Sequence, residues 1–436
     1  MAARSKSGRS TGADGAPALI GRLFRTEAGR LIAHFTRRFG PSQLDLAEEV
    51  VQDALVQALQ LWPYRGVPRN PTGWLYRVAC NRALDVLRRR SAFGARAAEI
   101  ARALARDRDD ADRPDRRERR LRAVEDDELA MVLMCCHPSL TREAQVTLSL
   151  KTVCGLSVGE IARALLCDER SVAQRLVRAK RRIRARRVSF EMPVGRALAA
   201  RVESAVDVIY LLFNEGYAAS SGDDIVRADL CREALRLGLR LADAPAVATP
   251  RVHALVALMA LHAARAPARR DSAGDLVLLE DQDRSAWDRD LLALGFEHLQ
   301  RSMNGPAVTP LHLQAAIAAT HASAPTADAT DWRTILELYD ELVAVEPSPV
   351  ARLNRAVAVA KVHGPRAGLA ALSPLARERA LARYYLLPAV RGDLLARAGD
   401  VENARRAYRL ALSRPCSNPE RRFLESRLRR IVRTSA

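Results

Sequence analysis

The residues best suited to chemistry on nucleic acid lie in GLSVGEIARALLCDERSVAQRLVRAKRRIRARR, positions 155–187. Ser157 and Glu160 stand at the spacing of a capping box, which predicts that a short helix begins there. After a tight turn, either Asp168 or Ser171 can cap a second helix. The apolar positions of both segments recur at helical spacing. This arrangement predicts a helix-turn-helix.

The second of these helices carries many hydrogen-bond donors away from its apolar face. Arginine and glutamine can pair bidentately with guanine and adenine edges in the major groove, and the basic residues that follow suit phosphates. Leu166 stands where such a turn usually carries glycine, which leaves the turn geometry open. The alternative is a solvated basic helix with no partner. The DNA contacts predicted from these side chains are Arg170, Gln174, Arg175, Arg178, Lys180, Arg181 and Arg182.

An acidic stripe interrupts the basic first half at DLAEEVVQDALVQAL, residues 45–59. Apolar residues at Leu46, Val50, Leu55 and Leu59 predict an amphipathic helix with the acids on its other face. Carboxylates repel DNA phosphates, so this face is better explained as a surface that docks another protein. The acidic docking residues are Asp45, Glu48, Glu49 and Asp53.

Aromatic and cationic side chains alternate in WPYRGVPRNPTGWLYRVACNRALDVLRRR, residues 62–90. Aromatic rings with nearby cations suit unpaired bases, which stack on such rings. Taken alone, Trp62 and Trp74 are better explained as core residues, so both interpretations stay open. The nucleic-acid contacts predicted here include Trp74, Arg77, Arg82, Arg88 and Arg89.

Helices must position all of these motifs, and the composition favours them. The chain has 436 residues, of which 48% are hydrophobic and only 5% aromatic, and alternating β-branched runs are scarce, so an all-α fold is predicted. Residues 1–190 carry 37 Lys and Arg against 22 Asp and Glu, whereas residues 191–436 carry 33 against 29. A GC-rich coding bias would raise arginine in both halves alike. The first half therefore has the charge of a nucleic-acid binder.

Composition shifts divide the chain into five predicted parts. These are a disordered tail (1–17), a helical domain (18–91), a flexible linker of mixed charge (92–124), the helix-turn-helix domain (125–188) and a larger helical domain (193–436). In the last part, Gly392, Ala404, Tyr408 and Ala411 have the offsets of a helix-hairpin repeat of about 34 residues, which predicts a helical-repeat domain.

The order of these blocks over about residues 20–188 resembles the extracytoplasmic-function type of bacterial RNA polymerase sigma factor. The resemblance implies that 45–59 docks core RNA polymerase, that the helix GWLYRVACNRALDVLRRR melts and recognises the −10 element of promoter DNA, and that the helix-turn-helix recognises the −35 element. It adds Gln52 to the docking face and Ser171 to the −35 helix. In the −10 helix it implies roles for Asn81, Asp85 and Arg88.

Segments of the second half, FNEGYAAS (213–220) among them, resemble the long C-terminal extension of one subgroup of these factors. That extension carries tetratricopeptide-like helices and is thought to regulate the factor in cis, so a regulatory protein or ligand is expected there. Asn214 and Glu215 could belong to a small-molecule or peptide site, although a buried, satisfied polar pair is favoured.

Other classes of function find little support in the sequence. The seven scattered cysteines are predicted to be reduced, no catalytic residue, metal site or cofactor is predicted, and the acids at 280–288 lack the spacing of a calcium loop. No run of about 18 apolar residues exists, so no membrane association is expected and the protein is predicted to be cytoplasmic. The predicted function is promoter-specific initiation without catalysis. The alternatives are a one-component helix-turn-helix regulator and an enzyme in the C-terminal half.

Overall fold

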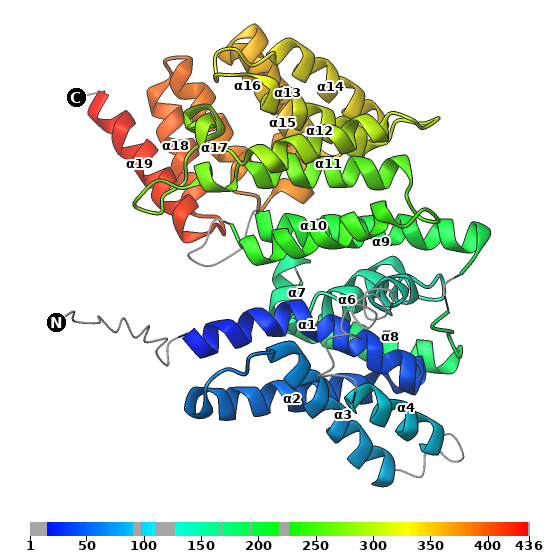
Figure 1. The fold of residues 1–436 in the computed structure, drawn as a ribbon. Coiled ribbons are helices and arrows are strands. Elements are labelled where there is room, and N and C mark those ends of the chain that lie inside the picture. The colour runs from blue at the N-terminus through cyan, green and yellow to red at the C-terminus, as the bar shows by residue number, and fades with distance from the viewer. Residues whose placement is uncertain are drawn as a thin grey trace, which may run out of the picture. The chain divides into compact units, whose positions relative to one another are not determined.

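The computed structural model describes residues 15–89, 97–109, 127–165, 167–191, 193–217 and 226–434. Over these residues the chain is helical, and the extended pairing is confined to an isolated bridge between Arg270 and Leu276. The all-α prediction is confirmed. Figure 1 shows the helices in order. They form two compact units, Met1–Val208 and Ile209–Ala436, and the boundary between the units falls inside one long helix, α9.

The first unit begins with three helices that share one core: α1 (Gly15–Phe39), α2 (Leu44–Arg65) and α3 (Pro71–Arg89). A 3-10 turn, η1 (Pro41–Gln43), joins the first two of them. Phe35, Val50 and Leu75 are each fully buried where these helices pack together. Leu59, predicted on the apolar face of α2, is instead 49% exposed, because the buried face of this end of the helix runs through Leu55, Ala58 and Trp62.

Part of the predicted linker (92–124) is helical. Helix α4 (Ala97–Asp109) packs against α3 and buries Ile100 and Leu104. Two apolar side chains at helical spacing are enough to hold this segment on the domain, which the charge-rich sequence concealed. The rest of the linker, and the predicted disordered tail except for the first residues of α1, lie outside the described residues.

The second block of the first unit contains a helical segment at 127–135, followed by α6 (Arg142–Thr152), α7 (Val158–Ala164) and α8 (Glu169–Ala185). The start of α9 (Gly195–Tyr217) packs on this block, where Arg201 donates to the carbonyl of Leu133 and Arg142 pairs with Asp207. The first unit thus holds both predicted binding domains.

The second unit is built around α11 (Pro250–Ala264), which is apolar on all sides and almost fully buried. It packs against α10 (Ala228–Asp243), α12 (Arg289–Ser302) and α13 (Pro310–Ser323). Gly295 of α12 lies so close to Leu261 that a Cβ atom there would come within 2.6 Å of the leucine Cγ. The missing side chain therefore allows the two helices to approach closely.

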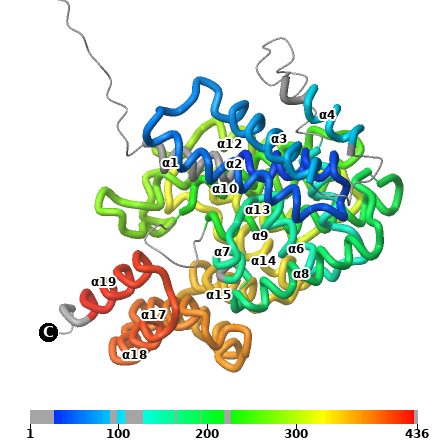
Figure 2. The backbone as a smooth tube through the Cα atoms, turned by 90° about the horizontal axis from the view of Figure 1, so that it is seen from below, coloured from blue at the N-terminus to red at the C-terminus, as the bar shows by residue number. Residues whose placement is uncertain are grey.

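Helix pairs continue the second unit to its end: α14 (Trp332–Val345) with α15 (Pro349–His363), then α16 (Pro365–Leu372), α17 (Leu386–Arg397), α18 (Val401–Leu412) and α19 (Asn418–Thr434). In Figure 2, as in Figure 1, α17, α18 and α19 lie together. The predicted repeat positions meet here, because Gly392 lies under the ring of Tyr408 and the side chains of Ala404, Tyr408 and Ala411 are buried.

None of the described helices combines the length and the apolar character that crossing a membrane requires.

Candidate nucleic-acid interface

The local geometry of the predicted helix-turn-helix is present. The Ser157 amide donates to Glu160 Oε2 at 2.7 Å and the Glu160 amide donates to Ser157 Oγ at 3.2 Å, so the capping box forms in both directions. Of the two candidate caps for α8, Asp168 is the one used: it accepts from the amide and the hydroxyl of Ser171, each at 2.8 Å. Leu166, where the turn geometry was open, lies outside the described residues.

Helix α8 buries one face and exposes the other. Val172, Leu176 and Ile183 are buried in the domain, as the sequence spacing predicts. Ser171, Arg175 and Lys180 are half-buried. The predicted DNA contacts that are fully exposed are Arg170, Gln174, Arg178, Arg181 and Arg182. The exposed set includes side chains able to reach a base edge and cations able to reach phosphates.

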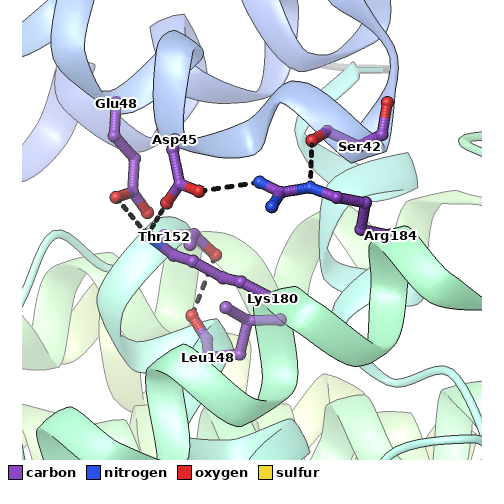
Figure 3. Close-up of polar contacts among 7 residues, drawn as sticks. All are labelled: Ser42, Asp45, Glu48, Leu148, Thr152, Lys180 and Arg184. Atoms are coloured by element: carbon purple, nitrogen blue, oxygen red, sulfur yellow. Dashed lines mark hydrogen bonds and ion pairs between the residues drawn. The ribbon is translucent and has the colours of Figure 1, made fainter.

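On α8, the predicted DNA contacts Arg175 and Lys180 pair with acids on other helices. Arg175 lies 3.5 Å from the carboxylate of Glu143 on α6. Lys180 reaches across to α2, where its Nζ donates to Asp45 Oδ1 at 2.8 Å and to Glu48 Oε2 at 2.6 Å (Figure 3). Arg184 adds hydrogen bonds to Asp45 Oδ2 at 3.1 Å and to the Ser42 carbonyl at 3.2 Å. The contact formed by Lys180 and Arg184 with Asp45, Glu48 and Ser42 is called the α8–α2 clamp below.

The electrostatics of the α8–α2 clamp favour the charged forms of both partners. Burial alone would lower the pKa of Lys180, but Glu48 and Asp45 outweigh it, and the pKa is raised. Burial would likewise raise the pKa of Asp45, but the hydrogen bonds and charges of Lys180 and Arg184 leave that pKa lowered. The side chains of Lys180 and Glu48 are only 17% and 12% exposed, so solvent screens their ion pair weakly.

The other half of the acidic stripe is neutralised from α3. Arg82 Nε donates to Asp53 Oδ2 at 2.5 Å, and a second guanidinium nitrogen lies 3.8 Å from Glu49. Gln52, between these acids, is exposed. The structure therefore brings the predicted docking residues together on one face of α2, but it also pairs them with two residues, Arg82 and Lys180, that were predicted to contact DNA.

The predicted −10 helix, α3, divides its residues between a core face and an exposed face. Trp74 is half-buried against the fully buried Trp62, with ring centroids 5.4 Å apart in an edge-to-face arrangement, so both rings serve the core. Arg77 is half-buried as well. Asn81, Asp85, Arg88 and Arg89 are exposed, and Asp85 lies 3.7 Å from Arg88. The last turns of α3 are thus the accessible part of this predicted surface.

Sequence reasoning missed a buried polar network between α1, α3 and the helical segment at 127–135. Asp127, which is 2% exposed, accepts from Arg37 at 2.7 Å and lies 3.0 Å from His34 Nδ1. The other ring nitrogen of His34 lies 2.8 Å from the hydroxyl of Tyr76 on α3. Because Asp127 stands in the acidic run at 125–128, nothing in the sequence separates it from a solvated charge. The network ties α1 and α3 to the helical segment at 127–135.

The FNEGY segment at the end of α9 differs from the predicted buried polar pair. Glu215 is buried and lies 3.9 Å from a guanidinium nitrogen of Arg227, but Asn214 is exposed and lines a cavity of the second unit. Successive residues of a helix point about 100° apart, so one can be buried while its neighbour faces an opening. In the acidic loop, Asp288 caps α12 and Glu280 pairs with Lys361 and Arg397.

Comparisons with known proteins match three segments of the chain to protein families. Residues 24–93 match sigma-70 region 2, and residues 130–183 match sigma-70 region 4. Residues 201–303 match a family of unknown function, DUF6596. The chain is 41% identical over 387 residues to uncharacterized protein R00370 of Rhizobium meliloti (strain 1021), an alignment that covers 88% of this chain and 90% of that protein. No solved structure was found to match.

Proposed function

We propose that this chain, whose residues 24–93 and 130–183 match sigma-70 regions 2 and 4, is an initiation factor of the extracytoplasmic-function type. In this proposal it binds core RNA polymerase in the cytoplasm and directs it to promoters that carry −10 and −35 elements. The observation that carries the proposal is that one unit has both an acidic face, on α2, and exposed basic and polar faces, on α3 and α8.

The proposed role of each face follows from the chemistry of its exposed side chains. On α8, Arg170, Gln174 and Arg178 are exposed donors suited to base edges, and Arg181 and Arg182 are suited to phosphates. The exposed end of α3 offers amide, carboxylate and guanidinium groups to bases that have left the duplex. The factor supplies binding energy and specificity to polymerase and carries out no reaction of its own.

We infer that the α8–α2 clamp is part of the regulation of this factor. The acids Asp45 and Glu48 cannot dock polymerase while Lys180 and Arg184 occupy them, and Lys180 cannot contact a phosphate at the same time. Binding of polymerase or promoter therefore requires the clamp to open. The C-terminal tetratricopeptide-like domain is proposed to bias this opening in cis, on receipt of a protein or ligand.

A co-precipitation with core RNA polymerase tests the proposal. Wild-type chain is expected to bind, and the charge reversals Glu49→Lys and Asp53→Lys together are expected to abolish binding, because they present cations where the docking face needs acids. Exposed acids off this face, Glu99→Lys and Glu191→Lys together, form the matched control and should bind like wild type. Circular dichroism checks that all three chains fold.

If the wild-type chain binds promoter DNA but not core polymerase, the initiation-factor proposal is wrong. A one-component helix-turn-helix regulator would then explain the DNA binding.

A further inference from the structure

A large cavity in the second unit contains a buried cation that pairs with no acid among the described residues. The cavity measures about 1000 Å³, at the upper end of the range for small-molecule sites, and is lined from α9, α11, α13, α14 and α15 among others. Among its lining residues, Arg265 is only 9% exposed. Within the described residues it donates one hydrogen bond, to the Tyr217 hydroxyl at 2.8 Å, and its Nε has no partner.

In the part of the chain that the structure describes, the surroundings of Arg265 add positive charge and supply no carboxylate. Arg284, which also lines the cavity, uses its guanidinium on the carbonyls of His321 and Ala324 and on Thr330 Oγ1. Burial lowers the pKa of His262 well below its ordinary value, and the charges of Arg265 and Arg269 lower it further. Burial, with the charges of Arg265 and Arg284, lowers the pKa of His321 to about 4. At neutral pH the imidazoles are uncharged, so the guanidinium groups set the sign of this end of the cavity.

The acids of the cavity lie elsewhere and are occupied or exposed. Glu280 is paired with Lys361 and Arg397, and Asp393 lies 2.9 Å from Arg397. Asp328 and Glu346 are exposed to solvent. A buried charge is normally paired, because desolvation costs several kcal/mol that only a counter-charge or good hydrogen bonds offset. Among the described residues Arg265 has the Tyr217 hydroxyl and the face of the Trp287 ring, 5.9 Å from its guanidinium carbon, but no carboxylate.

The cavity walls near this cation are aromatic. Phe213 and Tyr217 stack with centroids 5.7 Å apart, and Trp332 packs edge-on against His321. Tyr210 and Tyr339 complete this part of the lining. Polar side chains lie among these rings, and the Tyr210 hydroxyl donates to Gln314 at 2.9 Å. Flat apolar walls with a few oriented polar groups suit a ligand that has a ring-like body.

We propose that this cavity is a binding site for a small organic anion, with its acidic group at Arg265 and its apolar, ring-containing body between the aromatic walls. The site is distinct from the surfaces assigned to polymerase and DNA. It offers the C-terminal domain a place to bind a regulatory ligand. Its existence does not depend on the initiation-factor proposal.

Two fluorescent probes that differ only in charge test the site on the full chain. Anilinonaphthalene sulfonate carries an anionic group on an aromatic body, and N-phenylnaphthylamine has the same body without the charge. Fluorescence titration, with stoichiometry from calorimetry, should show one saturable site that prefers the sulfonate. Arg265→Gln should weaken sulfonate binding by about tenfold or more, as expected for loss of a charge-assisted hydrogen bond, and change the neutral probe little.

Two further variants serve as a second test of the cavity and as a control for charge. Val357→Phe narrows the cavity without touching a charge and should weaken both probes, which covers the case in which Arg265→Gln fails to fold. Arg301→Gln removes an exposed cation outside the lining and should change neither affinity. The proposal is overturned if wild type shows no saturable site, if it binds both probes equally, or if Val357→Phe binds like wild type. Polymerase and DNA are absent from the assay, so such a failure leaves the initiation-factor proposal untouched.

Discussion

Lys180 lies on two proposed surfaces at once, and replacing it with glutamine separates their contributions. In the α8–α2 clamp its ammonium group is 2.6 Å from Glu48 and 2.8 Å from Asp45. Hydrogen bonds to charged groups contribute about 1.5–3 kcal/mol when shielded, and ion pairs exposed to solvent contribute about 0–1 kcal/mol. Glu48 is 12% exposed and Asp45 is 59% exposed, so only the first bond counts fully.

Loss of these two contacts destabilises the closed α8–α2 clamp by about 2 kcal/mol. The equilibrium between the closed and the open clamp then shifts about thirtyfold toward the open form. If polymerase binds only the open form, its apparent affinity rises by up to the same factor. Lys180→Gln should therefore bind core polymerase more tightly than wild type, by about tenfold to thirtyfold. It should also bind DNA more weakly, because it has lost a phosphate contact.

Fluorescence anisotropy of the labelled full chain with core polymerase measures the first effect. Arg181→Gln is the matched control: it removes the same charge from the neighbouring position of α8, where the side chain is exposed. This control should weaken DNA binding similarly and leave polymerase binding unchanged. Equal polymerase affinities for wild type and Lys180→Gln would refute the idea that the α8–α2 clamp covers the docking face.

Three other expectations follow from single residues. Arg178→Ala, which removes an exposed donor of α8, should cost about 1–3 kcal/mol in electrophoretic binding to a preferred promoter, and an equal loss on random DNA would show that it contacts phosphate only. Asp127→Ala should lower the free energy of unfolding in urea by about 3 kcal/mol because it breaks a buried network, whereas the exposed Asp85→Ala should change it little; similar values for both would contradict the role given to the network. His321, whose pKa falls to about 4 from an ordinary 6.5, makes unfolding easier as pH drops through this window, since the unfolded chain takes up the proton first. By about pH 5 the loss should reach about 2 kcal/mol in thermal unfolding, and His321→Gln, which cannot titrate, should lose less than wild type.

Local patterns were predictable from sequence because their partners are neighbours in the chain. The Ser157–Glu160 capping box and the buried stripe Val172, Leu176 and Ile183 each depend on residues a few positions apart, and both are present. Helix α4 was predicted to be part of a flexible linker because its stability depends on residues distant in the chain. Its Ile100 and Leu104 are buried, and the helix packs against α3.

The contacts that join the predicted surfaces could not be foreseen. Lys180 and Asp45 are 135 residues apart, and each has an obvious use on its own helix. The pairing of Arg82 with Asp53 likewise depends on how α2 and α3 pack. Charge patterning indicates an acidic and a basic face, but which charges neutralise each other is decided by tertiary packing.

Transcription in vitro tests the central claim most directly. Core RNA polymerase is combined with the full chain on fragmented genomic DNA from its source, and the 5′ ends of the transcripts are sequenced. The account predicts initiation above that of core enzyme alone, at start sites that share two upstream sequence elements at fixed spacing. Transcripts no more frequent than with core enzyme alone, or start sites without shared elements, would contradict it.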